Sequence, residues 1–289
     1  MAIEQSEKPT SKHYSVSAFV VGTFALSWAV WLGLIAAAHL GRLASESLAS
    51  FYGWGGLGPS LVAFVLTART DGGSGVKRLA ARLLRWRAPL RWYAFALSAP
   101  IVIRLLGLAL YGATGGTLLA NPVAPAAVVI AFLIGLVVPL MEEFGWRGYM
   151  LTALLGRWRP IPAGLCVGIV WAVWHLPLFW IEGTGFYRWG QTSGVPLAML
   201  GYSAAVVGLS MLFTLVFCHT DGNLVLAFLL HSATNTSADA LFAPYQRLGI
   251  LGPAWWSVAV TTAAGACACL ALRHHRAAAA QHEGHVGQA

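Results

Sequence analysis

Long apolar runs separated by short polar stretches dominate the chain. A helix that crosses a bilayer needs about 20 mostly apolar residues. The runs are continuous and do not alternate with polar residues, which favours helices over the strands of a barrel. The pattern predicts eight membrane-spanning helices, at about 15–38, 50–68, 92–112, 124–155, 161–181, 196–218, 223–242 and 254–272.

Composition agrees with an all-α polytopic membrane protein. Hydrophobic residues make up 58% of the chain and charged residues 10%, whereas a soluble domain has about 45–50% and about 25%. These values exclude a disordered chain, a nucleic-acid-binding domain and an ordinary cytosolic enzyme. A disulfide framework or zinc ribbon is not indicated, because the cysteines lie inside apolar runs without a C-x-x-C pair: Cys166, Cys218, Cys267 and Cys269.

Basic residues predict the orientation in the membrane. With the N-terminus in the cytoplasm, Arg42, Arg188 and Arg247 lie outside, Arg104 and Arg147 lie within spans, and the other 13 of the 18 Lys and Arg residues lie inside. This asymmetry follows the positive-inside rule. We therefore expect a multi-pass protein of the cell (inner) membrane, with the lipid bilayer as its surroundings and both termini cytoplasmic. The expected parts are a cytoplasmic N-terminal tail (1–14), an eight-helix membrane domain (15–273, catalytic core about 124–242) and a flexible C-terminal tail (274–289).

Two basic features leave alternatives open. The segment 71–90 places apolar residues among arginines, which is typical either of an amphipathic helix on the inner leaflet or of a plain topology loop. Arg104 lies in the middle of a span. Its side chain either extends toward an interface, as long basic side chains do, or contacts a carboxylate of a substrate.

Ionisable residues inside the membrane are the strongest functional signal, because a charge at mid-bilayer costs roughly 2.5–3.5 kcal/mol or more. The first motif is E-E-F-G-W-R, from Glu142 to Arg147. Glu143 and Arg147 are four residues apart, share a helix face and can pair, while Glu142 points elsewhere. Pro139 lies just upstream and should kink the helix. The structural alternative is a surface salt bridge at a helix end.

Two further motifs carry histidines. In W-A-V-W-H, Trp171 and His175 share a face, and in H-S-A-T-N, His231 and Asn235 do so, with Asp239 one turn beyond. Their structural alternatives are an interfacial anchor and a hydrogen-bonded patch between helices. At about 1.5 Å per residue, Glu142, His175 and His231 lie roughly 22, 22 and 15 Å from the cytoplasmic ends of their helices. The spacing therefore predicts that they meet in one polar cavity, reachable from the cytoplasm.

The three motifs resemble those of the CAAX-protease and bacteriocin-processing family of intramembrane proteases, which includes the type II CAAX prenyl endopeptidases. That family's motifs are Glu-Glu-x-x-x-Arg, Phe-x-x-x-His and His-x-x-x-Asn/Asp, and here they read EEFGWR, WAVWH and HSATN, in the same order. The match covers about 124–239. Trp171 stands where the family usually has Phe, and we expect adjusted packing there.

The resemblance implies an intramembrane endopeptidase. By this similarity Glu142 and His175 activate water, His231 and Asn235 stabilise the oxyanion, and Glu143, held by Arg147, positions its helix or assists the site. The partner would be a peptide or protein substrate, either prenylated, embedded in the membrane or carrying a leader. A metal-free glutamate base is slightly favoured. The alternative is a zinc site of Glu142, His175 and His231, with two histidines and one carboxylate, in which Glu143 would take over as the base. A proton- or ion-coupled transporter and a non-catalytic immunity or scaffold protein are the other hypotheses.

Overall fold

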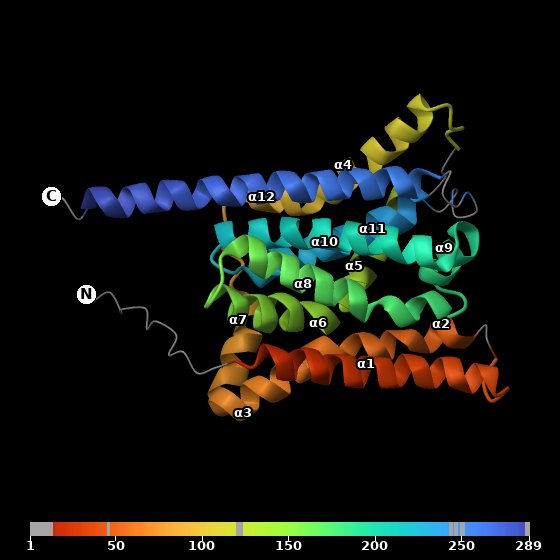
Figure 1. Ribbon diagram of the computed structural model, residues 1–289, viewed down its shortest axis with the longest axis horizontal. Coiled ribbons are helices and arrows are strands. Elements are labelled where there is room, and N and C mark those ends of the chain that lie inside the picture. The colour runs from red at the N-terminus through yellow and green to blue at the C-terminus, as the bar shows by residue number, and fades with distance from the viewer. Residues whose placement is uncertain are drawn as a thin grey trace.

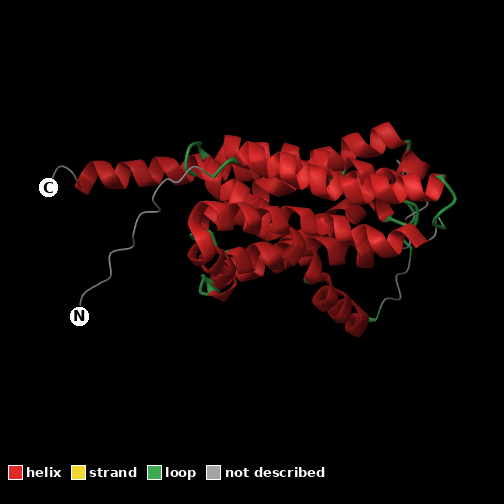
Figure 2. Cartoon of the chain, turned by 90° about the horizontal axis from the view of Figure 1, so that it is seen from below, coloured by secondary structure: helices red, strands yellow, loops and turns green. Residues whose placement is uncertain are grey.

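Helices account for all the regular structure in the computed structural model, which describes residues 14–44, 47–119, 124–242, 245, 248 and 252–286, without the side chains of residues 240 and 274–286. The predicted tail at 1–14 lies outside these ranges except for Tyr14. No strand occurs in the described ranges (Figure 2). The elements are α1 (Val16–His39), α2 (Leu48–Phe51), η2 (Tyr52–Leu57), α3 (Gly58–Ala81), η3 (Arg82–Leu84), α4 (Leu90–Ala113), α5 (Pro125–Gly135), α6 (Val137–Glu143), η4 (Phe144–Leu151), α7 (Thr152–Leu155), α8 (Pro160–Trp174), η5 (Leu176–Trp180), α9 (Gly185–Ser193), α10 (Val195–His219), α11 (Leu224–Phe242) and α12 (Pro253–Val286).

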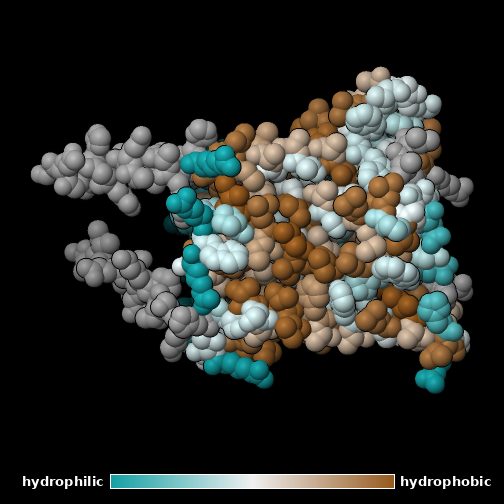
Figure 3. All heavy atoms as spheres, viewed as in Figure 1, coloured by the Kyte–Doolittle hydropathy of each residue, from teal (hydrophilic) through white to brown (hydrophobic). Residues whose placement is uncertain are grey.

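Seven helical stretches of the described chain are long and apolar enough to cross a membrane. They coincide with seven of the eight predicted spans, and the fold is that of an all-α polytopic membrane protein. The eighth predicted span is α11, whose apolar sequence is interrupted by His231, Asn235 and Asp239. A belt of hydrophobic residues crosses the middle of the bundle in Figure 3, and the hydrophilic residues gather at its two ends. Helix α1 begins, and α12 ends, on the same side of the bundle (Figure 1).

Close helix packing brings the predicted motifs together. Helix α10 packs against α8 and α12, α4 packs against α11 and α12, and α1 and α3 pack on each other at the opposite edge. Glycine permits the close approach of α8 to α10, because a Cβ added at Gly168 would lie 2.9 Å from the Cβ of Ser210. Small residues at helix crossings allow this kind of contact in membrane proteins. The histidine motif of α8 is thereby pressed against the centre of the bundle.

The long fourth apolar run is interrupted close to Pro139, where we expected a kink. Helix α5 ends at Gly135 and α6 starts at Val137, with a turn at Leu136 between them. A proline has no N–H to donate to the carbonyl four residues earlier, which here belongs to Gly135. The stretch after Glu143 then winds as a π-helix, η4, a conformation that is frequent at functional sites. Gly145 in η4 lies directly against α3, since a Cβ there would be 2.6 Å from the backbone of Pro59.

The basic segment 71–90 is helical in its first half. Helix α3 bends at Gly72, whose φ is 67°, and continues to Ala81 and into η3. Arg82 points inward and donates to the carbonyls of Gly148 and Gly222, at 2.9 and 2.7 Å. This arginine therefore ties α3 to η4 and to the turn before α11. At the other end of the chain, α12 continues as helix to Val286, beyond residue 273, where we expected a flexible tail to begin.

Candidate active site

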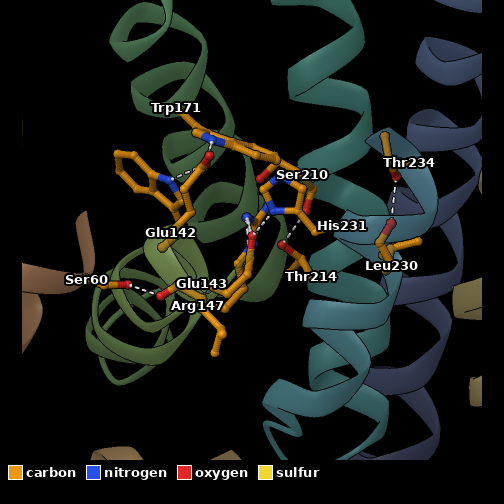
Figure 4. A network of polar contacts seen from close by, with 12 residues as sticks. Ser60, Glu142, Glu143, Arg147, Trp171, Ser210, Thr214, Leu230, His231 and Thr234 are labelled. Carbon is orange, nitrogen blue, oxygen red and sulfur yellow. Dashed lines mark hydrogen bonds and ion pairs between the residues drawn. The ribbon is translucent and has the colours of Figure 1, made fainter. Parts of the chain in front are cut away.

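The first motif forms a buried ion pair at the junction of α6 and η4. Glu143 and Arg147 are both fully buried, and Nη1 of Arg147 donates to both carboxylate oxygens of Glu143, at 2.8 and 3.1 Å. The guanidinium carbon lies 4.3 Å from the ring centre of Trp171 and 3.8 Å from that of Phe213. Figure 4 shows the pair turned toward α10 and α11. The alternative of a surface salt bridge is therefore wrong.

Glu143 also joins this pair to the third motif. Nδ1 of His231 lies 2.7 Å from Oε1 of Glu143. A carboxylate that is paired with an arginine can only accept hydrogen bonds, so Nδ1 of His231 carries the proton and donates. The second ring nitrogen, Nε2, is left free to act on another molecule. One carboxylate thus fixes the position of Arg147 and the tautomer of His231, and it connects α6 to α11.

Glu142 points away from its neighbour, as predicted, and is held by two tryptophans. Its Oε2 accepts hydrogen bonds from the indole N–H of Trp171, at 2.9 Å, and from that of Trp146, at 3.2 Å. Figure 4 shows the Glu142 carboxylate directed toward Trp171. Trp146 lies four residues after Glu142, on the same helical face. The bond from Trp171 was not foreseen, because it depends on how α8 packs against α6.

His175 ends α8 and is oriented by its own helix. Its Nδ1 lies 2.7 Å from the backbone carbonyl of Trp171. A carbonyl oxygen only accepts, so Nδ1 carries the proton and the neutral ring presents Nε2 as a base. The ring is enclosed by Trp174, Phe186 and Tyr202, with centroids 4.7, 5.7 and 5.1 Å away. The residue is buried in the protein, which contradicts the alternative of an interfacial anchor.

One cavity of about 790 Å³ brings together four of the six predicted site residues, namely Glu142, His175, His231 and Asn235. Glu143 and Arg147 do not line it and lie behind its wall. Binding cavities for small ligands typically have about 300–1,000 Å³, so this one can hold a short peptide segment. Tyr202, which the sequence did not single out, also lines it.

The direction of the cavity differs from our expectation. Its walls continue from the site to η2, α9 and the first turns of α12, which lie at the end of the bundle opposite the chain termini (Figure 1). We expected access from the end that carries the termini. The positions of the polar residues along their helices predicted the level at which they meet. These positions do not indicate at which end of the bundle the helices separate to open the cavity.

The three residues suggested as zinc ligands all line the cavity. In the parts of the chain that the structure describes, no group of three His, Cys, Asp or Glu side chains is placed to hold a metal ion. Oε2 of Glu142 accepts from two indole donors. The zinc site of Glu142, His175 and His231 stays a prediction. The histidines of the last segment, such as His282 and His285, have side chains outside the described part.

The fold and the site together define a polytopic α-helical membrane protein with a buried Glu–Arg–His network behind an internal cavity. Residues 124–237 match the family model described as type II CAAX prenyl endopeptidase Rce1-like. CAAX prenyl protease 2 of Methanococcus maripaludis is 25% identical over 114 residues, which cover 39% of this chain and 41% of that relative. Both matches lie in the region of the three motifs and support the resemblance of this core to the CAAX protease family.

The indole of Trp171 provides a direct test of how the Glu142 carboxylate is held. Trp171→Phe removes the 2.9 Å bond but keeps an aromatic ring beneath Arg147. A hydrogen bond to a charged group contributes about 1.5–3 kcal/mol, so we expect the free energy of unfolding in detergent to fall by about that amount. Trp158→Phe, at an exposed position, is the matched control. Equal unfolding curves for the two variants would contradict the assigned bond.

Proposed function

We propose that this chain is an endopeptidase that hydrolyses a peptide bond of a membrane-associated substrate inside the cavity. The observation that carries the proposal is the convergence of Glu142, His175, His231 and Asn235, from three separate helices, on one cavity. Amide hydrolysis needs an activated water, donors for the oxyanion and a proton donor for the leaving amine. The cavity offers groups of each type. The family match adds support, since its description is that of an endopeptidase.

In the proposed reaction, Glu142 and Nε2 of His175 take a proton from a bound water. The resulting hydroxide attacks the substrate carbonyl carbon, and the new C–O bond turns the carbonyl oxygen into an oxyanion. His231, with a proton on Nε2 as well as on Nδ1, and the side-chain amide of Asn235 donate hydrogen bonds to this oxyanion. The proton held by the Glu142–His175 pair passes to the amide nitrogen as the C–N bond breaks, and the products are a carboxylic acid and an amine.

Glu143 and Arg147 act as positioning residues in this scheme. They do not line the cavity, but Glu143 receives the Nδ1 proton of His231 at 2.7 Å. This bond directs Nε2 of His231 toward the cavity, and a carboxylate at Nδ1 supports the doubly protonated ring that donates to the oxyanion. We propose that Glu142 serves as the base and that the reaction runs without a metal. Stoichiometric zinc that tracks activity through chelation and readdition would contradict this part of the proposal.

The substrate that we propose is a hydrophobic or lipidated peptide, or a segment of a membrane protein. The relative is named a CAAX prenyl protease, and a prenylated C-terminal peptide is therefore the first one to test. Seven helical stretches suited to a bilayer support a reaction beside lipid. We propose the cell membrane as the location, with both termini in the cytoplasm.

A cleavage assay with purified full-length protein tests the function. A lipidated peptide is incubated with the protein in detergent, and the products are identified by mass spectrometry. Asn235→Ala should lower kcat by about 10²–10³-fold, the typical cost of losing one oxyanion donor. Gln191→Ala, at an exposed amide outside the cavity, is the control. Absence of cleavage by the wild type, together with solute uptake by proteoliposomes, would overturn the proposal in favour of a transporter.

A further inference from the structure

Arg104 is a cation in the cavity wall that the proposed reaction does not use. It lies near the middle of α4 and lines the same cavity as Glu142 and His175. Its Nε is buried and has no hydrogen-bond partner. Its guanidinium carbon lies 5.4 Å from the ring centre of Phe242. The side chain therefore faces the cavity.

The protein does not supply a counter-ion in direct contact with Arg104. No carboxylate of the described residues lies within 4.0 Å of its guanidinium, and no hydrogen bond to it occurs among them. Asp239 lines the same cavity but forms no ion pair with it. The other arginine of the cavity, Arg188, has a hydrogen-bond partner within the protein. It donates to the backbone carbonyl of Gly183 at 2.8 Å.

An unpaired guanidinium in a poorly hydrated wall favours an anionic ligand. Burying a charge is costly unless the charge is paired. Arginine offers donors in a planar fork that fits a carboxylate with two parallel hydrogen bonds. A peptide held in this cavity has one carboxylate at a position that does not depend on its side chains, namely its C-terminus.

We propose that Arg104 binds the C-terminal carboxylate of the peptide substrate and so restricts cleavage to bonds near the C-terminus. This inference rests on the proposed function. The volume of about 790 Å³ leaves room for only a few residues between the carboxylate and the scissile bond. Arg104 and the proposed catalytic groups Glu142 and His175 line this one cavity, together with Tyr202. A short peptide in the cavity would thus place its carboxylate at Arg104 and its scissile bond at Glu142 and His175.

The test compares one peptide in two forms, with a free C-terminal carboxylate and with a C-terminal amide. For the wild type we expect kcat/KM to be about 10- to 100-fold higher for the acid, as for a charge-assisted hydrogen bond. Arg104→Gln should remove this preference by lowering kcat/KM of the acid alone. Arg104→Lys should retain part of it. Arg188→Gln, which changes the other arginine of the cavity, should keep it.

The outcomes are distinct. Equal losses for acid and amide in Arg104→Gln, or no preference in the wild type, would overturn the carboxylate site while leaving the hydrolytic function intact. Binding is measured separately, by displacement of a fluorescent peptide acid from the Glu142→Gln variant. If no peptide is cleaved but the acid still binds more tightly than the amide through Arg104, the proposed hydrolysis is wrong and the carboxylate site stands.

Discussion

Glu142→Gln is expected to lower peptide cleavage by about 10³-fold or more, near the upper part of the range for loss of a general base. The substitution keeps the size of the side chain and leaves an oxygen for the indole donors of Trp171 and Trp146, which lie at 2.9 and 3.2 Å. The fold should therefore survive. What is lost is the ability to take a proton from water, because an amide is not a base at neutral pH.

The measurement is kcat with a lipidated peptide, read by mass spectrometry, together with the unfolding temperature of each variant. Glu182→Gln changes an exposed glutamate outside the cavity and should retain full activity. His175→Ala should match the loss of Glu142→Gln, since both groups handle the same water. More than a tenth of wild-type activity in a folded Glu142→Gln protein would remove Glu142 from its proposed role.

Arg147→Met is expected to destabilise the protein by about 3–5 kcal/mol, the usual cost of leaving one member of a buried ion pair without its partner. Both members are fully buried, and the pair is 2.8 Å long. Methionine fills much of the space between Trp171 and Phe213 but cannot neutralise Glu143. The remaining partner, His231, donates one hydrogen bond and would have to carry the carboxylate alone.

A second substitution separates charge from packing. In the double variant Glu143→Gln/Arg147→Met, no charge of the pair is left without its partner. The amide oxygen at position 143 can still accept a hydrogen bond from His231. We therefore expect the double variant to regain more than half of the stability that Arg147→Met loses. Arg78→Met is the control. The Arg78 side chain is 64% exposed and pairs with Asp71 at 3.4 Å, and an exposed ion pair of this kind contributes about 0–1 kcal/mol to stability. Unfolding by denaturant in micelles measures all of these. A loss below about 1 kcal/mol for Arg147→Met would show that the pair does not organise the junction.

Much of the site was predictable because helical periodicity is a local property. A spacing of four residues placed Glu143 with Arg147 on one face, and the structure shows this pair. The same rule directed Glu142 elsewhere, as observed. The position of the helix break followed from the missing N–H of Pro139. Each of these predictions needed only the geometry of one helix.

Contacts between helices were beyond the reach of the sequence. Trp171 looked like a change in packing relative to the family's usual phenylalanine, but its indole N–H bonds to Glu142. The bond from His231 to Glu143 spans 88 positions of the chain. Neither contact leaves a periodic trace, because each depends on how two helices rotate and translate against each other.

The sequence by itself determined the membrane class, the approximate positions of the spans and the three polar motifs. Hydrophobic length and the 3.6-residue period depend only on residues that are neighbours in the chain. Only the tertiary structure decided that Glu143 lies behind the cavity while Glu142 lines it, that the cavity extends away from the termini, and that Arg104 enters it without a partner. The reason is physical: the space between helices is set by side chains from several helices at once, and no single stretch of chain contains that information.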